Sequence, residues 1–334
     1  MSHTPPSRRR TQARLAAIVP VVALAAATMT ACSTGSDSDA GSASGVKDGK
    51  LESLRFINPL PNYPTWKQMA TCVKKATEAR DVTYSESGPT GTAMDATAMT
   101  QLTQQAISNK VGAIITTPVG DGFGSVLKQA QAKNIVTGTI YGPDGDDTGA
   151  DVNAGPDWNF IGETDIKAVN ARPGKHVVGM VAPADTGLGK QWMDGVKNAV
   201  SKTDNVTIAG AVYTGDDPAK GLAQVTALLT AHPDITDIVT NMGTTTPGAV
   251  AAIKAKNLKG KVFLTAVGID NGGREALDDG YVNQIFLQDI CSLGTSIADG
   301  VIDKAEGKEV KPIPVPVGVV GKEDLQSYLD KGWS

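Results

Sequence analysis

Polar side chains suited to hydrogen bonding follow several of the apolar runs in this sequence, at the points where buried strands would end. Amides, carboxylates and hydroxyls form paired hydrogen bonds with neighbouring hydroxyl groups, and an aromatic face covers the apolar side of a sugar ring. These residue types favour recognition of a polyol over covalent chemistry. The candidate binding residues are Asn58, Tyr63, Trp66, Thr117, Asp121, Tyr141, Lys190, Asn241, Asp270 and Gln288.

Several of these residues also have an ordinary structural interpretation. Asn241 and Asp270 each precede a segment with helical spacing, where asparagine and aspartate commonly cap a helix. Tyr63 and Trp66 fit packing of the first helix against the core about equally well. Glutamine is less useful as a helix cap, so the position of Gln288 after a buried strand favours a role in ligand binding more clearly.

Short apolar runs alternate with longer amphipathic segments from Leu54 onward. This alternation predicts an α/β fold with parallel sheets and helices on both faces. Ligands of such open sheets bind beyond the carboxyl ends of the strands, which is where the candidate residues fall. The expected strands are 54–57, 82–84, 112–116, 135–139, 176–181, 207–213, 237–240, 262–266 and 283–286.

The chain is long enough for two doubly wound lobes of about 100–150 residues each. Residues 142–156 are dense in Gly, Asp and Pro and interrupt the alternation, so we expect a lobe boundary there. The predicted hinge has three crossings, near Gly142, near Gln288 and in the proline-rich segment Lys311–Pro316. The N-terminal lobe then comprises residues 51–141 and 289–311, and the C-terminal lobe residues 142–288 and 312–334.

The N-terminus has the features of an export signal. Four arginines precede the apolar run Leu15–Ala27, which falls short of the roughly 20 residues of a membrane span. Cys32 follows Met29-Thr30-Ala31, so residues 1–31 predict a lipoprotein signal peptide with lipid attached to Cys32. Plain secretion is the alternative. Residues 32–50, rich in Gly, Ser and Asp, predict a flexible tether that anchors an extracytoplasmic domain to the cell membrane.

Composition excludes several other classes. The net charge of −4, with both signs interspersed, gives no basic face for nucleic acid. The three histidines are isolated and the common enzyme motifs are absent, so we expect no metal site, no cofactor and no catalysis. Cys72 and Cys291 could pair in an oxidising compartment or remain buried thiols.

The order of four strand ends resembles the type I periplasmic solute-binding proteins of the sugar class, such as the ribose, galactose and autoinducer binders. Asn58 follows Phe56-Ile57, Asn241 follows Thr240, Asp270 ends Gly268-Ile269-Asp270, and Gln288 stands at the hinge. The resemblance covers almost the whole chain beyond the tether. Because these positions hydrogen-bond the ligand in that family, it implies the same role for these four residues.

The sequence departs from ribose-type members at three places. Tyr141, in Thr139-Ile140-Tyr141-Gly142, stands where they carry an Asp-Arg pair. Lys190 stands where the family often has arginine, and the two are not equivalent for bidentate hydrogen bonding. Residues 163–174 are also short for the first helix of the second lobe. These departures bear on ligand identity more than on fold.

The resemblance implies a monomeric binding protein. It would capture a small hydroxylated solute, such as a sugar, by hinge closure and present it to an ABC permease. A receptor that presents the solute to a membrane signalling partner would use the same fold and stays an alternative. The export signal argues against the effector domain of a transcriptional repressor, and the missing catalytic motifs argue against a secreted hydrolase.

Overall fold

The computed structural model describes residues 45–120, 122–142, 149–155, 158–215, 217–311, 313 and 315–334. Cys32, the predicted signal peptide, most of the predicted tether and Asp121 lie outside these residues. The described residues belong to a single compact unit. None of the helices in this described part has the length and apolar character needed to cross a membrane.

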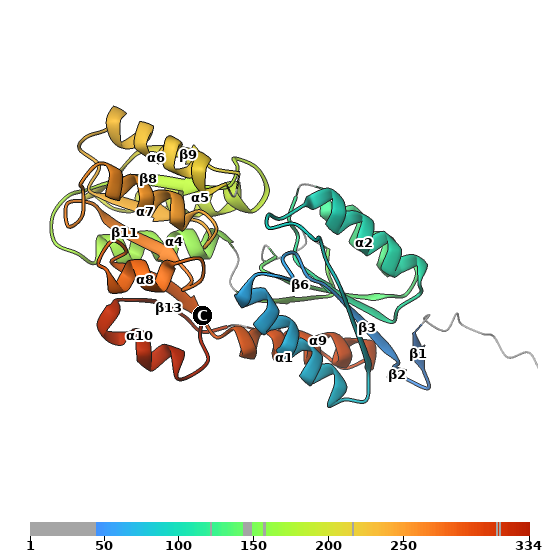
Figure 1. Cartoon of the computed structure of the whole chain (residues 1–334). Helices are drawn as coiled ribbons and strands as arrows, with labels where there is room; N and C mark the ends of the chain where they lie inside the picture. The colour runs from blue at the N-terminus through green and yellow to red at the C-terminus, as the bar shows by residue number, and fades with distance from the viewer. Residues whose placement is uncertain are drawn as a thin grey trace, which may run out of the picture. The chain divides into compact units, whose positions relative to one another are not determined.

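Five parallel strands form the first sheet, in the spatial order β4-β3-β5-β6-β7 (Figure 1). β5 is buried at every position, as expected for a strand covered on both faces. Helices α1 and α9 pack together on one face, and α2 and α3 on the other. The elements of this N-terminal lobe are β3 (Ser53–Ile57), α1 (Pro64–Glu78), β4 (Thr83–Ser87), α2 (Ala96–Ser108), β5 (Ala113–Thr116), α3 (Phe123–Gln131), β6 (Val136–Ile140), β7 (Val152–Ala154) and α9 (Ile290–Ala305).

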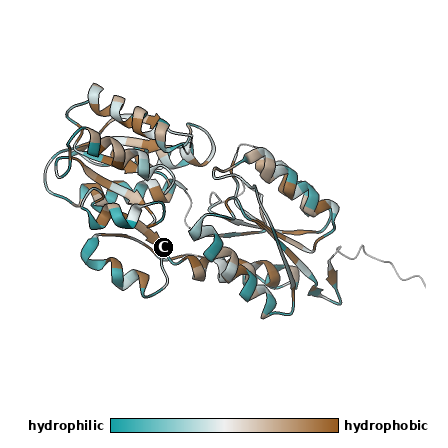
Figure 2. Cartoon of the chain, viewed as in Figure 1, coloured by the Kyte–Doolittle hydropathy of each residue, from teal (hydrophilic) through white to brown (hydrophobic). Residues whose placement is uncertain are grey.

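Six strands form the second sheet, in the order β13-β12-β11-β10-β8-β9, with β13 antiparallel to its neighbour. The strands of both sheets carry much of the apolar sequence, whereas the outer helices show many hydrophilic positions (Figure 2). Helices α4 and α5 pack as one pair and α6 and α7 as another. The elements of this C-terminal lobe are α4 (Trp158–Asn170), β8 (His176–Ala182), α5 (Gly187–Val200), β9 (Val206–Tyr213), α6 (Pro218–Ala231), β10 (Asp237–Thr240), α7 (Thr246–Ala255), β11 (Phe263–Val267), α8 (Gly273–Asp278), β12 (Gln284–Gln288), β13 (Val317–Val320) and α10 (Lys322–Leu329).

The lobe boundaries differ from those predicted. β7 pairs with β6, and Ile313 forms an isolated parallel bridge with Ala154 of β7. The first crossing therefore follows residue 155 instead of residue 142, and the third follows Ile313 instead of Lys311. Three-residue β7 gives too short an apolar signal to stand out from the turn-forming residues around it.

Four further elements differ from what the sequence predicts. β13 follows a proline-rich segment that indicated only an extended crossing. A two-stranded hairpin, β1 (Val46–Lys47) and β2 (Lys50–Leu51), lies in the segment predicted to end the tether. The first helix of the C-terminal lobe, expected to be short, is the full-length α4.

Close approach between helices fixes α4 on α5. A Cβ atom at Gly162 would lie 2.2 Å from the backbone oxygen of Trp192, and one at Gly195 would lie 2.0 Å from that of Asn159. Only glycine allows this contact, so the start of α4 is held firmly where it enters the C-terminal lobe.

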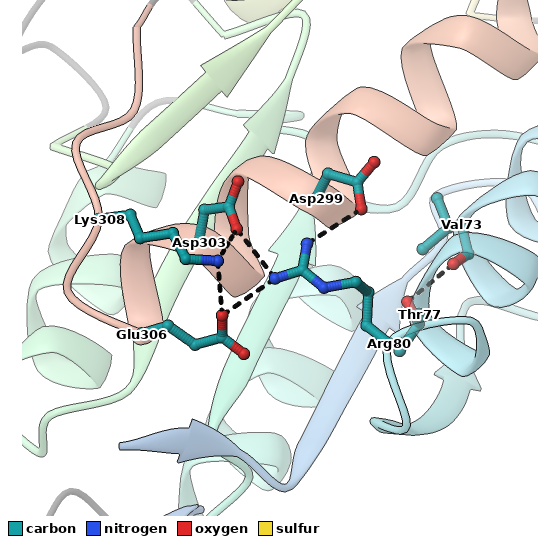
Figure 3. A network of polar contacts seen from close by, with 7 residues as sticks. All are labelled: Val73, Thr77, Arg80, Asp299, Asp303, Glu306 and Lys308. Carbon is teal, nitrogen blue, oxygen red and sulfur yellow. Dashed lines mark hydrogen bonds and ion pairs between the residues drawn. The ribbon is translucent and has the colours of Figure 1, made fainter.

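Helix α1 is tied to α9 at two levels. Cys72 and Cys291 form a disulfide with a Cα–Cα distance of 5.3 Å. Just beyond the carboxyl end of α1, the Arg80 guanidinium lies 2.9 Å from an oxygen of Asp303 and 3.0 Å from one of Glu306 (Figure 3). Hydrogen bonds from Lys308 and then Arg80 hold the pKa values of these two carboxyls below their ordinary range. Together these ties fix α1 within its lobe.

Candidate functional site

A cleft lies where the carboxyl ends of strands from both sheets meet. It is reached by the segments after β3 and β6 in the N-terminal lobe and after β10, β11 and β12 in the C-terminal lobe. Its empty volume is about 620 Å³, a figure that includes the open space at its mouth. The lining residues are Leu60, Tyr63, Thr65, Trp66, Met94, Tyr141, Trp158, Ile161, Met242, Gly243, Thr244, Val267, Gly268, Phe286, Gln288 and Ser334.

Three aromatic side chains form a row along the cleft. Trp66 of α1 meets Tyr141 edge to face, with ring centroids 5.9 Å apart. Tyr141 in turn lies 5.7 Å from Trp158, the first residue of α4. Offset and edge contacts of this kind are favourable and orient the rings. The row therefore spans from the N-terminal lobe to the start of the C-terminal lobe.

Tyr141 occupies a strained backbone conformation. Its φ of 58° lies in the left-handed region, which costs a bulky side chain about 1–2 kcal/mol. Burial raises the pKa of its hydroxyl well above the ordinary value, while a hydrogen bond with Gln288 opposes the rise. The hydroxyl is therefore a neutral group that can both donate and accept a hydrogen bond.

Buried polar atoms without a partner occur at the cleft and beside it. Trp158 Nε1 and Gln288 Oε1 belong to lining residues, and neither has a hydrogen-bond partner among the described residues. Asn241, directly before the lining residue Met242, is fully buried with both its Nδ2 and Oδ1 unpartnered. An unpaired buried polar atom costs about 1–3 kcal/mol, so these atoms are suited to bind a ligand.

The two lobes also contact each other directly at the N-terminus of α1. Its N-cap residue, Tyr63, makes no side-chain capping hydrogen bond. Instead the Asp270 carboxylate of the C-terminal lobe accepts hydrogen bonds from the Thr65 backbone N–H, at 3.1 Å, and from the Thr65 hydroxyl. A carboxylate at this end of a helix is favourable because of the helix dipole. Asp270 thus caps a helix of the opposite lobe.

Further contacts reinforce this junction. The Tyr63 hydroxyl lies so close to Gly243 that a Cβ atom there would be 2.1 Å from it. The Gln68 side chain donates to the backbone oxygen of Gly332 at 3.1 Å. Gln288 and Ser334 exchange backbone hydrogen bonds of 3.2 and 3.1 Å, which joins the end of β12 to the tail after α10.

The comparisons with known proteins agree with this architecture. A model of the periplasmic binding protein domain matches residues 25–309. The chain belongs to the periplasmic binding protein domain family. Comparison with curated protein sequences gives no match.

Solved structures share the fold of this binding protein. A solute-binding protein of an ABC transporter from Burkholderia graminis, in complex with D-arabinose, is 23% identical, with a TM-score of 0.74 over 85% of this chain and 99% of the other. GanP, a glucose-galactose binding protein from Geobacillus stearothermophilus, is 18% identical, with a TM-score of 0.77 over 82% and 98%. A periplasmic ribose ABC transporter protein from Conexibacter woesei is 20% identical, with a TM-score of 0.71 over 87% and 97%.

The structure of this binding protein brings together only some of the predicted site residues. Tyr63, Trp66, Tyr141 and Gln288 line the cleft, whereas Asn241 is buried beside it and Asp270 holds the lobe junction. Asp121 lies outside the described residues.

Three of the predicted residues instead bond to neighbouring groups within their own lobes. The Asn58 amide nitrogen donates to Glu86 Oε1 at 2.8 Å and to the Trp66 backbone oxygen at 3.3 Å, while its oxygen accepts from the Leu60 N–H. The Thr117 hydroxyl donates to the Ile140 carbonyl. Lys190 pairs with Asp194 one turn along the exposed face of α5.

Several lining residues were missed from the sequence. Trp158, Ile161 and Phe286 are apolar or aromatic, and in the sequence they look like core residues. Trp158 could have been found from its place just after the Gly- and Pro-rich stretch, where a helix of the second lobe had to begin. Among the described residues, no cluster of His, Cys, Asp or Glu is arranged to hold a metal ion.

Proposed function

We propose that this protein is an extracytoplasmic substrate-binding lipoprotein of an ABC importer, which captures a sugar or a similar hydroxylated solute. The observation that carries the proposal is the cleft between two lobes, where an aromatic row lies beside buried polar atoms that lack partners. Aromatic faces suit the apolar side of a sugar ring, and unpaired amide and indole groups suit its hydroxyls. Bound D-arabinose, D-allose and D-fucose in proteins of the same fold support this choice.

Capture follows from the placement of these groups on both sides of the hinge. Trp66 and Tyr141 come from the N-terminal lobe, whereas Asn241 comes from the C-terminal lobe and Gln288 stands at a crossing. A ligand that contacts both lobes binds the closed arrangement more tightly than the open one and so shifts the population toward it. The permease would then recognise the closed lobes.

Isothermal titration calorimetry of the full chain against a panel of pentoses, hexoses, polyols and nucleosides tests this function. We expect at least one neutral sugar or sugar derivative to bind with a Kd in the micromolar range or below, with one ligand per chain. Absence of heat with every compound of the panel would reject the proposal.

Membrane anchoring through Cys32 is a separate part of the proposal, because it rests on the signal sequence alone. The variant Cys32→Ser should move the protein from the membrane fraction to the soluble extracytoplasmic fraction without changing its sugar affinity. Retention of the variant in the membrane fraction would contradict lipid anchoring at this residue.

A further inference from the structure

The chemistry of the cleft narrows the class of guest. Among the described residues that line it, none carries a charged side chain. The lining includes Leu60, Met94, Ile161, Met242, Val267 and Phe286 in addition to the aromatic row. A fully hydroxylated sugar needs a partner for almost every hydroxyl, whereas this surface offers mainly carbon atoms.

The polar groups that the sequence assigned to hydroxyl recognition are largely occupied. The Asp270 carboxylate accepts two hydrogen bonds from Thr65, and the Asn58 amide is engaged on both of its polar atoms. Lys190 lies on an exposed helix face, with 60% of its side chain accessible to solvent. None of these three residues lines the cleft.

Four buried polar atoms at and beside the cleft have no hydrogen-bond partner among the described residues. Trp158 Nε1 and Asn241 Nδ2 are donors, and Asn241 Oδ1 and Gln288 Oε1 are acceptors. Together they can satisfy two or three hydroxyls, and the neutral Tyr141 hydroxyl in the lining can take part as well. Each further hydroxyl buried without a partner lowers affinity by roughly tenfold. Apolar surface on the guest would instead be buried favourably against the aliphatic and aromatic lining.

We infer that the guest is a neutral sugar ring that carries an apolar substituent, such as a deoxy position or an aryl or alkyl aglycone. Two or three of its hydroxyls face Trp158, Asn241 and Gln288, and its apolar part faces the lining formed by Leu60, Ile161 and their neighbours. This inference rests on the proposed sugar-binding function and specifies the substrate class of the same site.

Matched pairs of sugars test the inference by calorimetry on the full chain. Suitable pairs are D-galactose with D-fucose, its 6-deoxy analogue, and D-galactose, D-glucose and D-ribose each with its phenyl β-glycoside. We expect the apolar member of at least one pair to bind ten times more tightly than its parent sugar, or better. Parents that bind as tightly as their derivatives in every pair would overturn the inference and leave the proposed function intact. No binding by any member of any pair would also overturn the inference, whereas the proposed function fails only if every compound of the wider panel is silent as well.

Two variants separate the apolar and polar contributions. Met242→Gln places an amide among the lining side chains, so it should lower the preference for the apolar member at least threefold. Trp158→Phe keeps an aromatic ring and removes the N–H donor, so it should weaken both members of a pair by a similar factor. An unchanged preference in Met242→Gln would count against an apolar guest.

Discussion

The two ends of strand β10 each carry a buried polar side chain, but the two side chains differ in whether they have hydrogen-bond partners. At its amino end, Asp237 is 1% exposed and accepts hydrogen bonds from Thr236 Oγ1 at 2.6 Å and from His176 Nδ1 at 2.9 Å. Arg172 forms an ion pair with the same carboxylate, and its guanidinium lies 3.7 Å from the centroid of the Phe263 ring. This end of the strand is a polar cluster held together by protein groups.

At the carboxyl end, Asn241 follows the strand directly and is fully buried, with no partner among the described residues for either amide atom. Three residues lie between a satisfied side chain and an unsatisfied one. Because leaving a buried polar group unpaired is costly, the satisfied end serves stability and the unsatisfied end is available for a ligand. Substitutions at the two ends should therefore affect different measurements.

The largest effect on stability is expected at the amino end. Asp237→Ala leaves the partly exposed Arg172 and the buried His176 without their shared carboxylate, and breaking a buried pair of this kind typically costs about 3–5 kcal/mol of unfolding free energy. Chemical denaturation measures this loss. Sugar affinity of the folded fraction should stay within about twofold of the parent value. A change in stability below about 0.5 kcal/mol would show that the cluster does not stabilise the lobe.

Asp165 in α4 is an intermediate case, because one of its oxygens accepts a hydrogen bond from Trp192 Nε1 at 2.9 Å and the other has no partner in the described part of the chain. Burial raises the pKa of its carboxyl from 3.8 to about 8, against the opposing effect of the Trp192 hydrogen bond. The folded protein therefore retains a proton that the unfolded chain releases. Its stability should be highest below about pH 4 with respect to this group and should fall as the pH rises toward 8.

Asp165→Asn removes this titration and keeps an acceptor for Trp192. We expect the variant to be more stable than the parent by at least about 2 kcal/mol at pH 8, and the difference to disappear near pH 4. Thermal unfolding at both pH values measures it. A difference that does not depend on pH would mean that Asp165 ionises normally in the folded protein.

Asn241→Leu tests the role of the unpartnered amide at the carboxyl end of β10. Because no described hydrogen bond is lost and an unpartnered amide is removed, stability should stay the same or rise slightly. Affinity for the sugar identified by calorimetry should fall at least tenfold, about 1.4 kcal/mol. The opposite pattern, with stability lost and affinity retained, would assign Asn241 a structural role.

The strand positions could be predicted from the sequence because strands of a covered parallel sheet are continuous apolar runs. β10, at Asp237–Thr240, lies where the pattern indicates it. Whether a polar side chain after a strand has hydrogen-bond partners could not be predicted. Asn58 and Asn241 look alike in the sequence. Asn58 nevertheless donates a hydrogen bond to Glu86, 28 residues away, whereas Asn241 has no side-chain hydrogen bond among the described residues. That difference is set by tertiary neighbours, which no local pattern records.

Asp270 lies at the junction of the lobes, so its effect should appear in hinge closure. Asp270→Ala removes the anion that caps α1, worth about 1 kcal/mol at a helix N-terminus. We expect the ligand-free variant to have a larger radius of gyration than the ligand-free parent in X-ray scattering. Its sugar affinity should be lowered by about fivefold. Thr65→Val removes the hydroxyl partner, and a double-mutant cycle with Asp270→Ala should show that the two losses are not additive. Additive losses would mean that Asp270 acts through another contact.

The smallest effect is expected at Lys190, which the family resemblance placed in the site. Its side chain is 60% exposed and pairs with Asp194, itself 43% exposed, in an i,i+4 arrangement on α5. Such pairs contribute about 0.3–0.5 kcal/mol because water and salt screen them. Lys190→Ala should therefore change stability by less than about 0.5 kcal/mol and leave sugar affinity within about twofold. A tenfold loss of affinity would instead require α5 to present Lys190 to the ligand, and the cleft would then contain a charge that its described lining lacks.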